Sequence, residues 1–371
     1  MSTVSVTNLK NAASASNNIV LAADGSVSIV GGAVSPYTGM RNRIINGAMT
    51  IDQRNAGAAT TPAAGVTYLI DRFNLTAQQA SKFTFQQVTD APAGFKNSTK
   101  ITVAAQYSPA AGDVFYFSQP IEGNNVFDLA FGTASASTIT LSLWIKGSVA
   151  GTYAASILNG ALSRSYIGNI TVTTSWAFQT VTFVGDTTGT WATDSSAGMS
   201  LNIDLGSGST FQSTAGSWQA GRFYRTSANV TFVNQANGST LFITGVQLEK
   251  GSTATPFEFR SIGTELALCQ RYFELFGNGG VASANAGNAT ANSGSFKFSV
   301  PKRATPTITH IANYTLWLPN VGGYVATTSA ISTASTSGCM LGIAVTPSPV
   351  TNGAALIYNT STDNLSASAE L

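Results

Sequence analysis

The sequence predicts an all-β protein with two β-sandwiches joined by a single short helix. Alternating apolar and polar residues recur along the chain, turns rich in Gly, Ser, Asn and Thr separate these runs, and only one stretch has helical spacing. Hydrophobic residues make up 43% of the chain, which is enough to bury a sizeable core. Charged residues make up only 9%, compared with roughly 25% in ordinary soluble proteins.

Composition argues against several classes of protein. The net charge of +2 is too balanced for a nucleic-acid-binding surface, which needs clustered Lys and Arg. No apolar run reaches the roughly 18 residues of a membrane span, and the first residues lack the basic and apolar regions of a signal peptide. With two cysteines and one histidine, we expect no disulfide scaffold, no zinc site and no Ser-His-Asp triad.

Residues 1–40 look like an attachment segment. Two short strands are expected on either side of Asp24-Gly25, which is a strong hairpin signal. A lone hairpin is marginally stable in water, so the segment cannot form its own core. A disordered terminus is one interpretation of this segment. Pairing of the segment with other subunits or with a larger assembly explains the alternating Val and Ile residues better.

Residues 41–260 are expected to form one central β-sandwich. From Ile139 to Ile145 every second residue is apolar, which places Trp144 on the opposite face, and Trp176 is expected in the core. The expected strands cover residues 81–88, 98–107, 113–121, 138–147, 151–158, 168–174, 177–185, 199–206 and 239–249.

Residues 261–276 are predicted to form the linker helix. Thr264 is a plausible N-cap, Glu265 lies in the first turn and Gly277 is a plausible stop. One helical face would carry Leu266, Cys269, Phe273 and Phe276.

Residues 277–371 return to a β pattern and are predicted to form a second, smaller sandwich. A long loop of small residues (277–295) comes first, followed by short strand-like runs. A Cys269–Cys339 disulfide is disfavoured, because the resemblance described next implies folding in a reducing cytosol.

Four blocks of sequence resemble tail-fibre and receptor-binding proteins of tailed bacteriophages. The most specific is ITGVQLEKGSTATPFEFRSIGTELALCQRYFE (243–274). The others are residues 42–57 with 68–76, residues 141–191, and residues 300–309 with 364–371. The blocks within 42–76 and 141–191 also resemble carbohydrate-binding jelly-roll modules, and residues 1–40 resemble the virion-proximal ends of such fibres.

The resemblance implies a virion protein, a homotrimeric tail fibre made in the host cytoplasm. Residues 1–40 would join the tail, the baseplate or an adaptor protein. The C-terminal part (277–371) would be distal and adhere without covalent chemistry to host polysaccharide or lipopolysaccharide. Two alternatives remain: a purely structural tail or baseplate component, and a polysaccharide depolymerase.

Aromatic residues are the candidate ligand contacts, because a sugar ring presents an apolar face to an aromatic ring. In the C-terminal part the candidates are Tyr314, Trp317 and Tyr324; in central turn-rich loops they are Trp191 and Trp218. Loop anchoring or packing between subunits is the alternative for each tryptophan. The single histidine, His310, is expected to be structural.

No catalytic residue, cofactor or metal site is expected. The nearest group of acids, Asp186, Asp194 and Asp204, does not suggest a glycosidase pair. Jelly-roll sugar modules often carry a structural calcium ion, but no Asp-rich ligand loop stands out, so that point stays open. Glu258, Arg260, Glu265 and Arg271 surround the linker helix. Ion pairs among them that fix the two domains or the three chains are expected, and solvated surface charge is the alternative.

Overall fold

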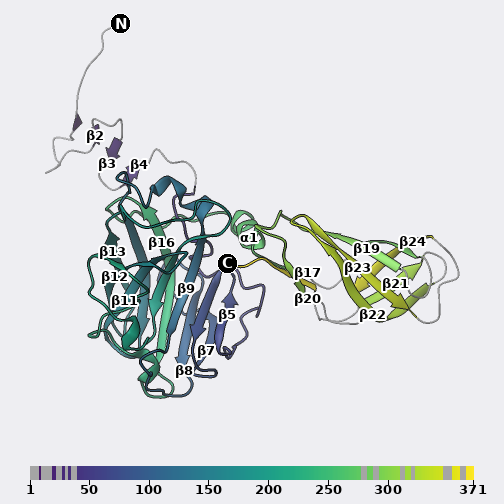
Figure 1. Ribbon diagram of the computed structural model, residues 1–371, viewed down its shortest axis with the longest axis horizontal. Coiled ribbons are helices and arrows are strands. Elements are labelled where there is room, and N and C mark those ends of the chain that lie inside the picture. Colours follow the sequence, from purple (N-terminus) through teal and green to yellow (C-terminus); the bar gives the residue numbers. More distant parts are fainter. Residues whose placement is uncertain are drawn as a thin grey trace, which may run out of the picture.

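The computed structural model describes residues 40–276 without interruption, together with shorter pieces on either side. The N-terminal pieces are strands β1 (Asn8–Leu9), β2 (Ile19–Leu21), β3 (Val27–Ile29) and β4 (Gly32–Val34). The C-terminal pieces are residues 282–286, 292–309, 314–318, 322–345, 353–359 and 365–371. A large sandwich and a slender barrel are joined at helix α1 (Figure 1).

The four N-terminal strands form an antiparallel sheet in the order β1-β2-β3-β4. The expected hairpin is confirmed, since Ile19 of β2 pairs with Ile29 of β3. Asp24-Gly25 itself lies outside the described residues.

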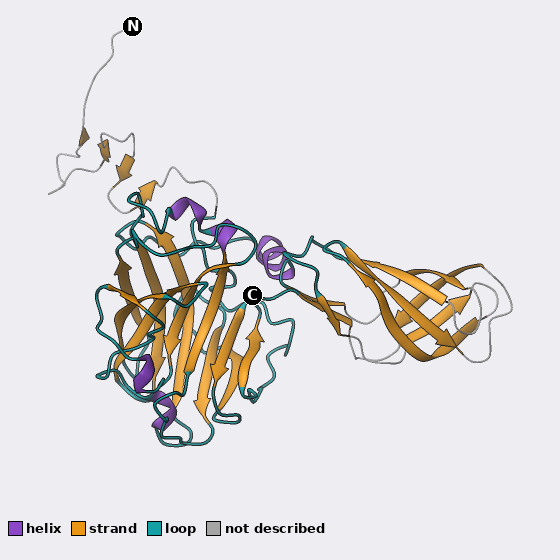
Figure 2. Ribbon diagram, in the orientation of Figure 1, coloured by secondary structure: helices purple, strands orange, loops and turns teal. Residues whose placement is uncertain are grey.

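The central region is a two-layered jelly-roll-like sandwich of antiparallel sheets, as the sequence predicted (Figure 2). The five-stranded sheet has the order β13 (Ala177–Phe183), β10 (Ile139–Gly147), β16 (Thr240–Lys250), β8 (Ser98–Val103) and β7 (Phe83–Val88). The seven-stranded sheet has the order β15 (Trp218–Ala220), β12 (Arg164–Val172), β11 (Gly151–Asn159), β14 (Ala197–Asp204), β9 (Phe115–Glu122), β6 (Phe73–Ala77) and β5 (Gly65–Ile70). Short 3-10 turns cover Gly123–Asn125, Phe127–Leu129, Ser209–Phe211 and Phe232–Asn234.

The core lies between these two sheets. Leu141 and Leu143 of β10 are fully buried there, and Phe73 stacks on Phe117 with ring centres 5.0 Å apart. Trp176 corrects the prediction, because it lies half-buried on the outer side of the five-stranded sheet. Its indole Nε1 donates to Asp90 Oδ1 at 3.2 Å, so a surface carboxylate is its hydrogen-bond partner.

Helix α1 (Ile262–Gln270) is shorter than predicted and begins differently. Ser261, not Thr264, is the N-cap, and its side chain accepts a hydrogen bond from the Thr264 backbone. Residues Phe273–Phe276 form strand β17 instead of a further helical turn, because they pair with β25 (Leu365–Ser368). Among the described residues no helix is long and apolar enough to cross a membrane.

The C-terminal part is all-β, but its strands close into a barrel where we expected a sandwich. The barrel runs β18 (Ala282–Ala286), β19 (Asn292–Lys297), β23 (Gly338–Val345), β22 (Gly322–Ala334), β21 (Tyr314–Leu318) and β24 (Gly353–Asn359). β24 pairs with both β18 and β21, which closes the ring and leaves no free edge. A three-stranded sheet, β17-β25-β20 (Thr307–Thr309), lies between this barrel and the sandwich.

Ion pairs hold the junction, as predicted. Arg260 binds Glu258 at 2.9 Å and Glu265 at 3.4 Å. Glu370, beyond β25, pairs with Arg54 at 2.9 Å and with the buried Arg72. The last residues of the chain therefore pack back on the sandwich. Cys269 and Cys339 are both buried and free.

Candidate functional site

A polar groove crosses the outer face of the seven-stranded sheet. β6, β9 and β14 alternate, with Leu75, Phe117 and Leu201 turned into the core. The intervening residues therefore point outward. Across the strands, Asn74 faces Ser118 and Ser118 faces Asn202, which makes a row of amide and hydroxyl groups. Three neighbouring strands thus align polar side chains in one row at the floor of the groove, where Asn74 is 4%, Ser118 5% and Asn202 2% exposed.

The groove has a volume of about 170 Å³ and no charged side chain in its lining. Its floor and rims are formed by Val66, Asn74, Thr76, Tyr116, Ser118, Pro120, Asn159, Gly160, Leu162, Ala197, Met199, Ser200, Asn202, Tyr224 and Leu371. Each primary amide can donate and accept hydrogen bonds, and each hydroxyl can do both. The groove is therefore suited to a neutral, hydroxyl-rich ligand.

An aromatic wall closes one side of the groove. Tyr224 belongs to the long connection between β14 and β16, and its ring stacks on Tyr116 with centres 4.4 Å apart. Arg222 Nε donates to the Tyr224 hydroxyl at 2.7 Å. Burial, followed by the neighbouring Tyr116, raises the pKa of Tyr224 far above its ordinary value, so this phenol stays protonated.

A buried arginine fixes this connection over the sheet. Arg225 lies 3.6 Å from Asp204 Oδ2, and its Nη1 donates to Thr231 Oγ1 at 2.9 Å. Asp204 also accepts from the backbone nitrogens of Gly206 and Ser207 at 2.8 and 3.0 Å. Burial raises the pKa of Asp204, while Arg225 and these hydrogen bonds oppose the rise. The wall is thus held in place before any ligand binds.

The acids singled out in the sequence are separate structural groups. Asp186 forms a two-pronged pair with Arg164 at 2.7 and 2.8 Å, and Asp194 accepts from the Ser196 backbone at 2.9 Å. Asp204 is buried beside Arg225, so each of the three acids is engaged with a partner of its own. Within the described ranges no group of three His, Cys, Asp or Glu side chains could hold a metal ion.

Trp191 and Trp218 lie together beside the edge of the seven-stranded sheet, outside the groove lining. Their rings are 5.4 Å apart, and both pack edge-on against Phe131. Trp191 Nε1 donates to the Thr188 carbonyl at 3.2 Å and Trp218 Nε1 to the Val184 carbonyl at 2.7 Å. Trp191 is thus anchored within its loop, whereas Trp218 begins strand β15 and does not lie in a loop as predicted. Ligand contact by either tryptophan stays a prediction.

The structure brings the three C-terminal candidates into one hairpin of the barrel. Tyr314 and Trp317 lie on β21, and Tyr324 lies on β22 opposite Leu316. Trp317 is 42% exposed. His310 lies outside the described residues. A role for this hairpin in ligand contact stays a prediction.

The groove residues were not predicted as a site. The signal was present, since FNLTA, FYFSQPIE and MSLNID each place a polar residue between apolar ones. However, the three segments are separated by long stretches of chain, and only strand pairing reveals that Asn74, Ser118 and Asn202 share one row.

No family model matches this sequence, and no curated protein is significantly similar to it. Among solved structures, the chain is similar to the enzymatically active domain of tailspike protein 4 of bacteriophage CBA120, with a TM-score of 0.29 and 16% identity over 59% of this chain and 22% of that one. It is also similar to a putative sugar binding protein from Bacteroides thetaiotaomicron (TM-score 0.30, 12% identity, 57% of this chain and 100% of that one). A third similar structure is the family 11 carbohydrate-binding module of a cellulosomal cellulase of Clostridium thermocellum (TM-score 0.27, 13% identity, 52% of this chain and 99% of that one). At these scores the likenesses carry no argument about function, which must come from the groove itself.

Proposed function

We propose that this chain is a binding protein that holds a neutral glycan in the groove of the seven-stranded sheet and breaks no bond in it. One observation carries the proposal: the row Asn74–Ser118–Asn202 lies beside the stacked Tyr116 and Tyr224 in a lining without charged side chains. Amides and hydroxyls can match sugar hydroxyls, and an aromatic edge can contact the apolar side of a sugar ring.

The lining favours binding over catalysis. A glycosidase needs two carboxyl groups on either side of the scissile bond, and this lining contains no carboxylate side chain. Non-covalent adhesion is the function that such a groove can perform.

The resemblance of the sequence to phage tail fibres supports a proposal about the kind of assembly in which this binding occurs. We propose a virion tail fibre, a homotrimer joined to the tail, the baseplate or an adaptor through residues 1–40, that adheres to host surface polysaccharide or lipopolysaccharide. Shallow sites bind weakly, and several linked copies convert weak binding into avidity.

The barrel hairpin is a second candidate location for the same function. The observation in its favour is the 42% exposure of Trp317, which leaves a large aromatic side chain on the surface. This location would place adhesion in the C-terminal part, as the sequence suggested.

A glycan array probed with the full chain tests the proposal, followed by titration of the strongest neutral oligosaccharide. Asn74→Ala and Ser118→Ala should each weaken binding several-fold to about tenfold, because each removes a hydrogen-bonding group. Thr180→Ala, on the exposed face of β13 in the other sheet, is the matched control and should bind as the unchanged protein does.

Other results would redirect the assignment. Loss of binding only in Trp317→Ala would move the site to the barrel. Absence of any array signal would favour the purely structural component, and release of reducing sugar would favour the depolymerase.

A further inference from the structure

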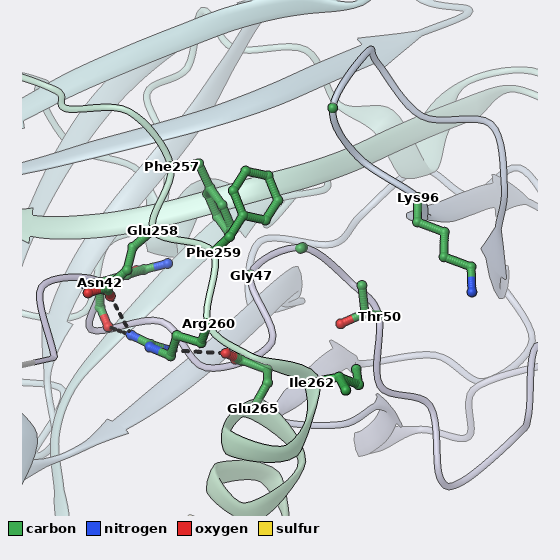
Figure 3. Close-up of a pocket in the computed structure, with 12 residues that line it drawn as sticks. Asn42, Gly47, Thr50, Lys96, Phe257, Glu258, Phe259, Arg260, Ile262 and Glu265 are labelled. Atoms are coloured by element: carbon green, nitrogen blue, oxygen red, sulfur yellow. Dashed lines mark hydrogen bonds and ion pairs between the residues drawn. The ribbon is translucent and has the colours of Figure 1, made fainter.

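A second cleft lies beside the start of α1 and shares no lining residue with the groove. It is formed by residues 47–50, the loop that carries Gly94 and Lys96, and the segment 257–262 (Figure 3). Its volume is about 220 Å³, below the roughly 300–1,000 Å³ of pockets for drug-sized ligands. The cleft is therefore of a size for one small ring.

Two phenylalanine rings, Phe257 and Phe259, line one wall of this cleft, and Phe95 packs against both. Phe257 and Phe259 have ring centres 4.8 Å apart, and each lies within 5.4 Å of Phe95. Phe259 nevertheless remains 62% exposed, and Ile262 beside it is 64% exposed. The wall thus holds a rigid aromatic ring with a free face.

The acidic side chains of the lining are already engaged. Glu258 accepts from the backbone of Asn42 at 2.8 Å and from Arg260 Nη2 at 2.9 Å. Glu265 accepts from the backbone of Asn46 and from Arg260 Nη1 at 3.4 Å. These bonds use the single lining arginine and both lining carboxylates to tie residues 42–46 to the start of α1.

Lys96 is the remaining charged residue of the lining. It is exposed, and the described part of the chain offers it no hydrogen bond or ion pair. Figure 3 shows its side chain on the side of the cleft away from Asn42 and Glu258, with the Thr50 hydroxyl between. An unpaired cation, a hydroxyl and an exposed ring face thus border one space.

We propose that this cleft is a second binding site, for a sugar ring that bears a carboxylate, such as a uronic acid. The carboxylate would accept a charge-assisted hydrogen bond from Lys96 Nζ, the ring would lie on Phe259, and Thr50 would bond a sugar hydroxyl. This site goes beyond the proposed function, because the groove has no charged side chain in its lining and is proposed to take a neutral ligand.

Calorimetric titration of the full chain with a galacturonic acid trimer tests the proposal, and the fully methyl-esterified trimer serves as the uncharged comparison. We expect saturable binding of the acid form that is about tenfold tighter than that of the ester and weakens in about 0.5 M salt. Lys96→Gln should lose this preference, whereas Lys96→Arg should retain most of it. Lys297→Gln, an equal change of charge on an exposed barrel residue, is the control.

The ring contact has its own pair of variants. Phe259→Ala should weaken binding of both trimers, and Phe259→Tyr should restore it; unchanged melting temperatures exclude unfolding as the cause. Equal affinity for acid and ester, or equal binding by Lys96→Gln and Lys297→Gln, would overturn the proposal. So would a fall in native mass in Phe259→Ala with ligand binding unchanged, which would make this face a contact between copies. Asn74→Ala should leave uronate binding intact, so the two sites fail independently.

Discussion

The carboxylate of Glu122, on β9 of the sandwich, lies 2.6 Å from Nη2 of Arg271 just after α1. Arg271 Nε donates to the same carboxylate at 3.0 Å, and the Tyr272 hydroxyl donates at 2.7 Å. Glu122 is only 1% exposed, so these donors replace the water that the charge has lost. The chain leaving the helix is therefore tied to β9 of the sandwich by this cluster of bonds.

Glu122→Gln should destabilise the protein by about 2–4 kcal/mol, because it leaves Arg271 and Tyr272 without their anionic acceptor. Urea unfolding measures the change in free energy. Asp90→Asn is the matched control: it breaks an ion pair with Lys146 in which Asp90 is 49% exposed, and it should cost less than about 1 kcal/mol. Equal losses for the two variants would contradict a central role for Glu122.

The penalty for Glu122→Gln should also depend on pH. Burial raises the pKa of Glu122, but hydrogen bonds from Arg271, Tyr272 and Asn124 outweigh burial and hold it below the ordinary value. A lowered carboxyl pKa stabilises the fold above the pKa of the unfolded chain, and this stabilisation is lost as pH falls through the lowered value. The difference between the two proteins should therefore shrink below about pH 4.

The buried Asp71 should make the stability of the fold depend on pH in the opposite direction. Burial raises its pKa to about 6, although hydrogen bonds from Gln53 oppose the rise. Its contribution to stability is present below the unfolded pKa of about 4 and is lost as pH rises through the folded value, by at most about 1.4 kcal/mol per pH unit. Asp71→Asn removes this titration, so its stability relative to the unchanged protein should improve by about 2 kcal/mol between pH 4.5 and 6.5. A difference that stays constant over that range would count against a raised pKa.

Gly160 sets the close approach of two chain segments at the rim of the groove. A Cβ at this position would lie 1.8 Å from the Ala197 carbonyl oxygen, so Gly160→Ala must push the two segments apart. We expect a cost of about 1–3 kcal/mol and a weaker neutral-glycan complex. Gly112→Ala, where no atom lies within 4 Å of the added Cβ, should leave both the melting temperature and binding unchanged. An unchanged melting temperature in Gly160→Ala would show that the rim adjusts freely.

Two variants test which residue is the N-cap of α1: Ser261, as in the structure, or Thr264, as the sequence suggested. Ser261 Oγ accepts from the Thr264 backbone at 3.3 Å, so Ser261→Ala should cost about 1 kcal/mol. Thr264→Ala keeps that acceptor and loses only a hydroxyl contact at 2.8 Å, so it should cost less. Thermal unfolding of the two variants decides between them; a larger loss in Thr264→Ala would favour the cap that the sequence suggested.

Local alternation was enough to predict most strands of the sandwich. In the run from Ile139 to Ile145 every second residue is apolar, and all of these apolar residues are buried. Alternation of this kind predicts a strand with one face in the core, whichever strands it pairs with. The helix was harder to delimit, because Phe273 and Phe276 fit both a helical face and a strand. Pairing with β25, almost one hundred residues further along the chain, decides for the strand.

The sequence by itself determined that this protein is β-rich, low in charge, apolar enough to bury a sizeable core and interrupted by one short helix. Only the tertiary structure decided that the C-terminal strands close into a barrel, that Glu370 returns to Arg54, and that Asn74, Ser118 and Asn202 form one row. The reason is physical: period and composition act over a few neighbouring residues, whereas strand partners and buried ion pairs are chosen by contacts between distant segments.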